Sequence, residues 1–206
     1  LKDAGLMSAI LALTARHHSK LPRSNGPTTP DVTDSESIRH YYETLRYVQE
    51  ALPYTSYTNS EELLATAIII SSYEMLDESD GRGNWQRHLK GVFWIQRSQD
   101  VNGGSGGLRQ AVWWAWLRQD VWAAFREKRP CFSFWVPVQE LGELDQHDLA
   151  DRAIYLLSQA VNYYANAAAS DSTTDRPTQA DLSHARVNIL HKIEELRSHF
   201  GEQYQP

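Results

Sequence analysis

The sequence predicts an all-α fold, an irregular bundle of about seven helices that form a single domain over residues 1–206. Apolar residues recur at spacings of three and four along most of the chain, which is the period of one helix face. The β-branched and aromatic stretch Cys131–Val138 has no second stretch with which to form a sheet. Hydrophobic residues make up 41% and charged residues 22% of the chain, so it is too apolar to remain disordered.

Capping residues and a proline bound the helices predicted in the first half of the chain. The first helix begins near the N-terminus and ends before a polar loop at 22–33. Asp34 or Ser35 can cap the second helix, which stops at Pro53. Ser60 is followed by two glutamates, which favour the positive end of a helix dipole, so a third helix begins there.

Four more helices are predicted in the second half, at about 84–98, 108–128, 148–169 and 178–200. Asn84 caps the first of them. The glycine-rich connector 101–107 leads into the most aromatic helix, which Pro130 ends. The polar linker 170–177 separates the last two helices.

The charge and cysteine content exclude several classes of site. The formal net charge is −6, which argues against direct DNA binding by this chain, because phosphate contacts need clustered positive charge. A single cysteine, Cys131, excludes an internal disulfide framework and a multi-cysteine zinc site. No apolar run reaches the length of about 18 residues that a membrane helix requires, so no membrane contact is expected.

The sequence offers no catalytic motif in a supporting context. Gly103–Gly107 matches the G-x-S-x-G pattern of a hydrolase nucleophile, but no strand precedes it, so a flexible connector is the better interpretation. His184, His191 and Glu195 share the polar face of the last helix, which favours a solvated stripe over a metal site. We therefore expect no enzymatic activity, no metal site and no cofactor in this chain.

Two charged residues lie on helix faces that are predicted to be buried. Glu74 shares a stripe of the third helix with Leu63, and Arg118 shares one of the fifth helix with Leu117. Burying either charge alone would cost several kcal/mol, so each needs a partner. The simplest prediction is an ion pair between Glu74 and Arg118. In an alternative, Arg118 lines a cavity and meets an anionic group of a small ligand.

Three further residues complete the candidate ligand site. His88 lies on the apolar stripe of the fourth helix, where a hydrogen-bonded core histidine is expected. Trp114 and Trp122 belong to an aromatic helix that is apolar on all sides and is therefore predicted to be central and buried, or to line an effector pocket. The candidate ligand-binding residues are thus Glu74, His88, Trp114, Arg118 and Trp122.

The aromatic helix also carries a family resemblance. The run from Trp113 to Pro130, WWAWLRQDVWAAFREKRP, resembles the signature helix of the fungal-specific regulatory domain found in fungal zinc-cluster transcription factors. Upstream, Ser71-Ser72-Tyr73-Glu74 and then Trp85, His88, Leu89 and Gly91 resemble the two preceding helices of that family. The resemblance is closest over Leu63–Pro137, moderate before it and weak after it.

The resemblance implies a nuclear, non-enzymatic, helical domain that regulates transcription in response to a small molecule or a protein partner. In this family a separate N-terminal module with six zinc-binding cysteines contacts DNA. Cys131 alone cannot form that cluster, so zinc is expected only in a part of the protein that precedes this chain. Because the chain starts at Leu1 in helical pattern and without Met, we expect it to be a fragment.

Two other function classes compete with a ligand-controlled regulator. The first is an interaction module without a ligand, which binds a co-regulator or forms a homodimer. Leu182, Ile189 and Leu196 of the last helix follow a heptad-like spacing that suits such a dimer, although packing within the chain uses the same pattern. The second is a helical enzyme, which the lack of an aspartate-rich metal motif disfavours.

Overall fold

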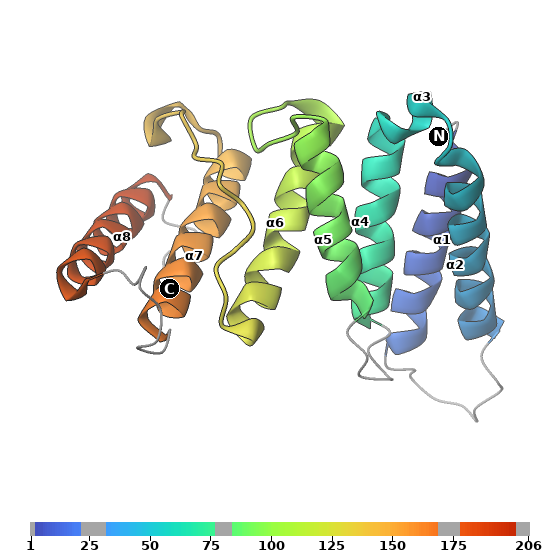
Figure 1. The fold of residues 1–206 in the computed structure, drawn as a ribbon, viewed down its shortest axis with the longest axis horizontal. Helices are drawn as coiled ribbons and strands as arrows, with labels where there is room; N and C mark the ends of the chain where they lie inside the picture. The colour runs from blue at the N-terminus through green and yellow to red at the C-terminus, as the bar shows by residue number, and fades with distance from the viewer. Residues whose placement is uncertain (1–2, 22–31, 77–83, 169–177, 201–206) are drawn as a thin grey trace. The chain divides into compact units, whose positions relative to one another are not determined.

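The structure, a computed structural model, describes residues 3–21, 32–76, 84–168 and 178–200 (Figure 1). Its helices are α1 (Ala4–Lys20), α2 (Val32–Ala51), α3 (Thr55–Thr58), α4 (Glu61–Leu76), α5 (Asn84–Ser98), α6 (Gly107–Glu127), α7 (Gln146–Ala168) and α8 (Gln179–His199), with a 3₁₀ turn η2 (Leu141–Glu143) before α7. Within these ranges there is no strand, which confirms the predicted all-α fold.

The predicted helix boundaries agree closely with the observed ones. Ser60 caps α4, since its hydroxyl accepts a hydrogen bond from the N–H of Leu63 at 3.1 Å. Thr178 caps α8 in a reciprocal capping box with Asp181. The helix that the sequence did not predict is α3, a single turn. The predicted loops at 22–33 and 170–177 fall almost wholly outside the described residues.

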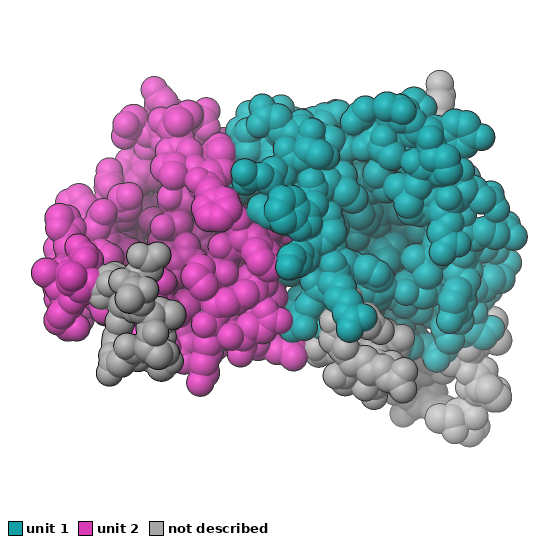
Figure 2. Space-filling model, viewed as in Figure 1, with its two compact units in different colours: residues 1–113 teal, residues 114–206 magenta. Residues whose placement is uncertain are grey.

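The chain divides into two compact units, residues 1–113 and 114–206, and the boundary falls inside α6 (Figure 2). In the first unit α4 packs against both α1 and α5, and α1 also packs along α2. Leu64, Ile68 and Tyr73 of α4 are buried together with Leu63 and Ile70. Because α4 is apolar on nearly every side, it forms the centre of this unit.

The second unit contains the C-terminal part of α6, a long extended connection, and the paired helices α7 and α8. Leu182 and Leu196 of the predicted dimer seam are both buried, and α8 packs on α7 of the same chain. The connection between α6 and α7 runs without regular structure except for η2 (Figure 1). The prediction that Cys131–Val138 joins no sheet is confirmed for this part of the chain.

Helix α6 is less uniformly buried than its apolar sequence predicts. Trp113, Trp114 and Trp116 are buried, but Trp122 is 61% exposed and Phe125 is 49% exposed. The prediction that Trp122 is buried is therefore wrong. Arg118 is also exposed rather than buried. Phe125 is partly covered by Tyr164 of α7, with 5.5 Å between the ring centroids, whereas most of the Trp122 side chain is exposed.

Candidate functional site

Glu74, the first of the candidate residues, lies at the centre of a polar cluster that joins α2, α4 and α5. Its side chain is 11% exposed, so it is largely buried as predicted. The hydroxyl of Tyr41 donates a hydrogen bond of 2.7 Å to Oε1 of Glu74, and Nδ1 of His88 lies 2.5 Å from Oε2. Tyr41 also stacks on Tyr73, with 4.7 Å between ring centroids. Both carboxylate oxygens of Glu74 therefore have a partner.

The electrostatics of this cluster favour a charged pair. The hydrogen bond to Glu74 raises the pKa of His88, although partial burial opposes the shift. Burial and the nearby Glu74 carboxylate raise the pKa of Tyr41 well above its usual value, so its hydroxyl remains a donor. His88 is 46% exposed, so the prediction of a core histidine is wrong, while the prediction that it is hydrogen-bonded is confirmed.

Arg118, the second charged candidate, belongs to the other compact unit and has a different partner. Its Nη2 lies 2.5 Å from Oδ1 of Asp151, which is only 4% exposed. Burial raises the pKa of Asp151, and the guanidinium of Arg118 opposes that shift. The predicted ion pair between Glu74 and Arg118 is therefore wrong. The reason is that helical periodicity identifies a face but does not identify the neighbouring element.

The two candidate tryptophans have separate environments. Trp114 is buried and meets Trp135 of the α6–α7 connection edge to face, with 5.8 Å between ring centroids. Trp122 is exposed. Of the five candidates, Glu74 and His88 form an ion pair with each other. The structure does not test whether any of the five binds a ligand.

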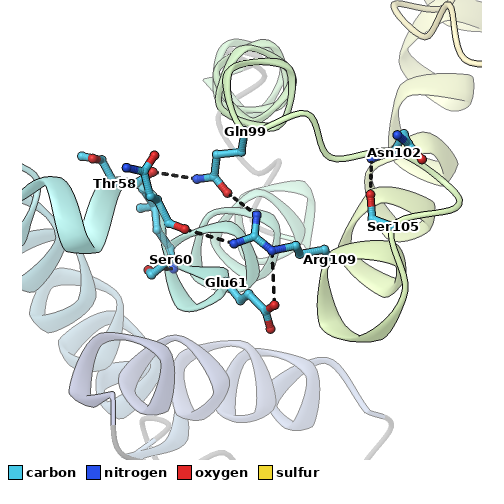
Figure 3. A network of polar contacts seen from close by, with 9 residues as sticks. Thr58, Ser60, Glu61, Gln99, Asn102, Ser105 and Arg109 are labelled. Atoms are coloured by element: carbon cyan, nitrogen blue, oxygen red, sulfur yellow. Dashed lines mark hydrogen bonds and ion pairs between the residues drawn. The ribbon is translucent and has the colours of Figure 1, made fainter.

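A second polar network, which the sequence analysis missed, is formed around Arg109 (Figure 3). Its guanidinium donates to Oε1 of Glu61 at 3.2 Å, to Oε1 of Gln99 at 3.0 Å and to the carbonyl of Asn59 at 3.1 Å. Gln99 in turn donates to the carbonyl of Thr58 at 2.6 Å. One side chain thus ties together the start of α4, the end of α5 and the start of α6. The sequence did contain a signal for this network. Arg109 lies in the first turn of α6, where a cation is unfavourable unless it has partners.

The G-x-S-x-G segment beside this network is a turn (Figure 3). Oγ of Ser105 accepts a hydrogen bond of 2.8 Å from the N–H of Asn102, and the N–H of Gly104 donates to Oδ1 of Asn102 at 2.9 Å. Gly106 and Gly107 have φ values of +77° and +56°, which a glycine adopts without strain. The interpretation of this segment as a connector is consistent with these contacts, and no histidine is bonded to Ser105 among the described residues.

A groove of about 540 Å³ opens between α2, α3 and the start of α4. It is lined by Tyr47, Glu50, Ala51, Tyr54, Ser56, Tyr57, Ser60 and Glu62. Tyr54 is 67% exposed at its rim. Glu50 and Glu62 are exposed, and the described residues that line the groove include no lysine, arginine or histidine. We call these eight residues the tyrosine groove; sequence reasoning missed it because α3 was not predicted.

Two phenols of the tyrosine groove, those of Tyr47 and Tyr57, have raised pKa values and remain neutral at physiological pH. Burial raises the pKa of Tyr57 to about 12. Tyr47 donates a hydrogen bond of 2.8 Å to Oδ2 of Asp3, and this bond raises the pKa of Tyr47. The groove therefore combines neutral aromatic rings with two carboxylates, a combination that attracts cations through ring quadrupoles and Coulomb forces. Arg46 reaches Glu50 only loosely, at 3.9 Å, with both side chains exposed.

Comparison with known proteins finds a similarity to one protein family over part of the chain. No curated protein and no solved structure matches this chain. Residues 1–98 of this chain match the model of the fungal specific transcription factor domain. The resemblance predicted from the sequence is thereby confirmed for α1–α5, the helices that the matched residues contain.

The extent of the match differs from the predicted one. The closest resemblance was predicted at Leu63–Pro137, with the run that begins at Trp113 as its main support, whereas the match ends at residue 98. The tyrosine groove and the Glu74 cluster both lie inside the matched residues 1–98. The match indicates a regulatory role in transcription for this part of the chain.

No helix among the described residues is both long and apolar enough to cross a bilayer. The ranges given above also contain no group of three histidine, cysteine or acidic side chains arranged to hold a metal ion.

Proposed function

We propose that this chain is the regulatory region of a fungal zinc-cluster transcription factor that acts in the nucleus. Its output is controlled by a positively charged group that binds in the tyrosine groove. The single observation that carries the proposal is the position of this groove, which lies wholly within the segment that matches the fungal transcription factor domain.

The chemistry of the groove defines the effector. Tyr54 presents an exposed ring, and Glu50 and Glu62 supply negative charge. An alkylammonium or guanidinium group fits these walls through cation–π and charge-assisted contacts, whereas an anion would be repelled. Such a group can come from a small amine or from a lysine or arginine of a protein partner. Glu74 and Arg118 support this role less well, because both are engaged in other contacts.

The DNA-binding function is proposed to belong to another part of the same protein. A zinc cluster needs six cysteines, and this chain has only Cys131. Burial raises the pKa of the Cys131 thiol to about 12, so it is a poor metal ligand. The regulatory region then acts on a partner module and does not need to contact DNA.

A transcription reporter assay tests the proposal. The 206-residue chain is fused to an unrelated DNA-binding domain in yeast, and reporter output is compared between the wild type and the double variant Glu50→Gln, Glu62→Gln. We expect the wild type to change reporter output and the variant to lose most of that change. The matched control is Glu194→Gln on the exposed surface of α8. A wild-type fusion without any effect on transcription would contradict the proposal.

A binding assay separates the effector from the transcriptional role. Thermal unfolding is recorded with a panel of alkylammonium and guanidinium compounds, and neutral amides of the same size serve as controls. We expect cations, and not amides, to raise the midpoint of wild-type unfolding, because a ligand that binds only the folded state stabilises it. If neither the cations nor the amides shift the unfolding midpoint while the reporter still responds, the results would favour an interaction module that binds a protein partner and no small ligand.

A further inference from the structure

The connection between α6 and α7 contains a segment with alternating exposure. Phe134, Val136 and Val138 are 80%, 61% and 89% exposed, whereas Ser133 before them and Trp135 and Pro137 between them are partly covered. A period of two is the signature of an extended backbone whose alternate side chains point to opposite faces. We call residues 134–138 the apolar segment.

The covered side of this region is anchored to the second compact unit. The ring of Trp135 meets Trp114 edge to face and also approaches Tyr155, with 6.5 Å between the latter centroids. Just upstream, the N–H of Phe132 donates to Oδ2 of Asp120, and the N–H of Cys131 donates to Oδ1 of Asn162, both at 2.7 Å. The extended conformation is therefore fixed from one side, while the other side presents three apolar side chains.

The two backbone edges of the apolar segment are not equivalent. In an extended chain, successive residues direct their N–H and C=O groups to opposite edges. On one edge Pro137 has no N–H, and the N–H of Trp135 is bonded to Oγ of Ser133 at 3.3 Å. On the other edge Phe134, Val136 and Val138 retain their donors and acceptors, and none of these groups has a partner in the described part of the chain.

We propose that the apolar segment pairs with the same segment of a second copy of this chain, as two antiparallel strands related by a two-fold axis at Val136. Phe134 then faces Val138 of the other copy, and Val136 faces its own equivalent. These three residue pairs use the backbone edge of Phe134, Val136 and Val138, and the two residues of each pair exchange two N–H···O=C hydrogen bonds. An isologous contact of this kind closes at two copies. The inference does not depend on the tyrosine groove and gives the dimerisation alternative a specific surface.

Charge at the two ends favours a second copy in this orientation. The segment itself carries no charge, so nothing in it repels its own equivalent. The exposed Lys128 precedes it, and the exposed Glu140 and Glu143 follow it. Antiparallel pairing brings the basic end of one copy near the acidic end of the other, whereas parallel pairing would oppose like charges. Lys128, with φ +53°, ends α6 and directs the chain into this path.

Cysteine crosslinking tests the axis of the proposed pair. Opposed Cα atoms of a hydrogen-bonded antiparallel pair are about 5.5 Å apart, which a disulfide spans. We therefore expect Val136→Cys to form a covalent dimer under mild oxidation. Phe134→Cys and Val138→Cys should not crosslink alone, because each is about 14 Å from its own equivalent. A mixture of these two variants should crosslink. The native Cys131 is buried and remains in every variant.

Analytical ultracentrifugation provides the second arm of the test. We expect the wild type to dimerise and Val136→Lys to raise the dimer dissociation constant at least about tenfold, because two lysines would oppose each other at the axis. The control Gln139→Lys adds the same charge at an exposed position on the other edge and should leave the dimer intact. A monomeric wild type, a dimer that survives Val136→Lys, or equal crosslinking by all three single cysteines would overturn the proposal.

Discussion

At Gly5, the backbone of α1 lies against the ring of Tyr47, and a methyl group added there would lie 2.7 Å from Cε1 of that ring. The ring cannot move away easily, because its hydroxyl is bonded to Asp3. Asp3 in turn caps α1 by accepting a hydrogen bond of 2.7 Å from the N–H of Leu6. Glycine is unfavourable inside a helix, but Gly5 is required here because α1 and α2 approach too closely for a larger side chain.

We predict that Gly5→Ala lowers the free energy of unfolding by about 1–3 kcal/mol, because overpacking outweighs the gain in helix propensity. The matched control is Gly91→Ala in α5, where an added Cβ meets nothing within 4 Å. That substitution should stabilise the protein by up to about 1 kcal/mol. Urea denaturation followed by circular dichroism measures both. A neutral Gly5→Ala would indicate that Tyr47 can shift.

The ion pair between His88 and Glu74 predicts a pH dependence of stability. The pKa of His88 is raised in the folded state, so the stability it contributes is present below its unfolded pKa of about 6.5 and is lost as the pH rises through the folded value. His88 is 46% exposed, so the contribution should not exceed about 1 kcal/mol. We expect the stability difference between wild type and His88→Gln to fall as the pH rises above about 6.5 in urea titrations. A difference that grows with pH would contradict the assignment.

At the scale of elements, the first compact unit depends on one guanidinium that joins three helix ends. Arg109 donates to a carboxylate, an amide and a backbone carbonyl, a geometry that suits the planar fork of arginine. A lysine ammonium at this position would retain the charge but could not reach all three acceptors in the same directions. The network therefore depends on the shape of the group and not only on its charge.

We predict that Arg109→Lys lowers the free energy of unfolding by about 1–2 kcal/mol, since hydrogen bonds to a charged group are lost and the partners are partly buried. Arg46→Lys on α2 is the control, because Arg46 is 77% exposed and reaches Glu50 at only 3.9 Å. It should change stability by less than about 0.5 kcal/mol. Equal effects of the two substitutions in urea denaturation would show that the network contributes nothing specific.

At the scale of the whole molecule, the net charge of −6 and the tyrosine groove both oppose contact with nucleic acid. We predict that the chain alone binds duplex DNA more weakly than about 10⁻⁴ M at physiological salt, which is the weak limit of non-specific binding. Fluorescence anisotropy with a labelled duplex measures this. Tighter binding that weakens steeply with added salt would mean that a basic surface has been overlooked.

The sequence by itself determined the all-α fold and nearly every helix boundary. Capping residues and prolines act within one or two turns of their own position, so Ser60 could be identified as the start of α4 without knowledge of the fold. Asp34 and Ser35, predicted as caps of α2, lie inside that helix, which begins at Val32. The central position of α4 was not predicted. The helix α3 was missed because a single turn has too few residues to establish a period.

Only the tertiary structure decided which elements meet. The partners of Glu74 are Tyr41 and His88, from α2 and α5, and the partner of Arg118 is Asp151 of α7. The same limit applies to Trp122, whose exposure depends on what covers α6. Periodicity is a property of one helix, whereas a contact between helices depends on how the connections direct them and on which surfaces fit.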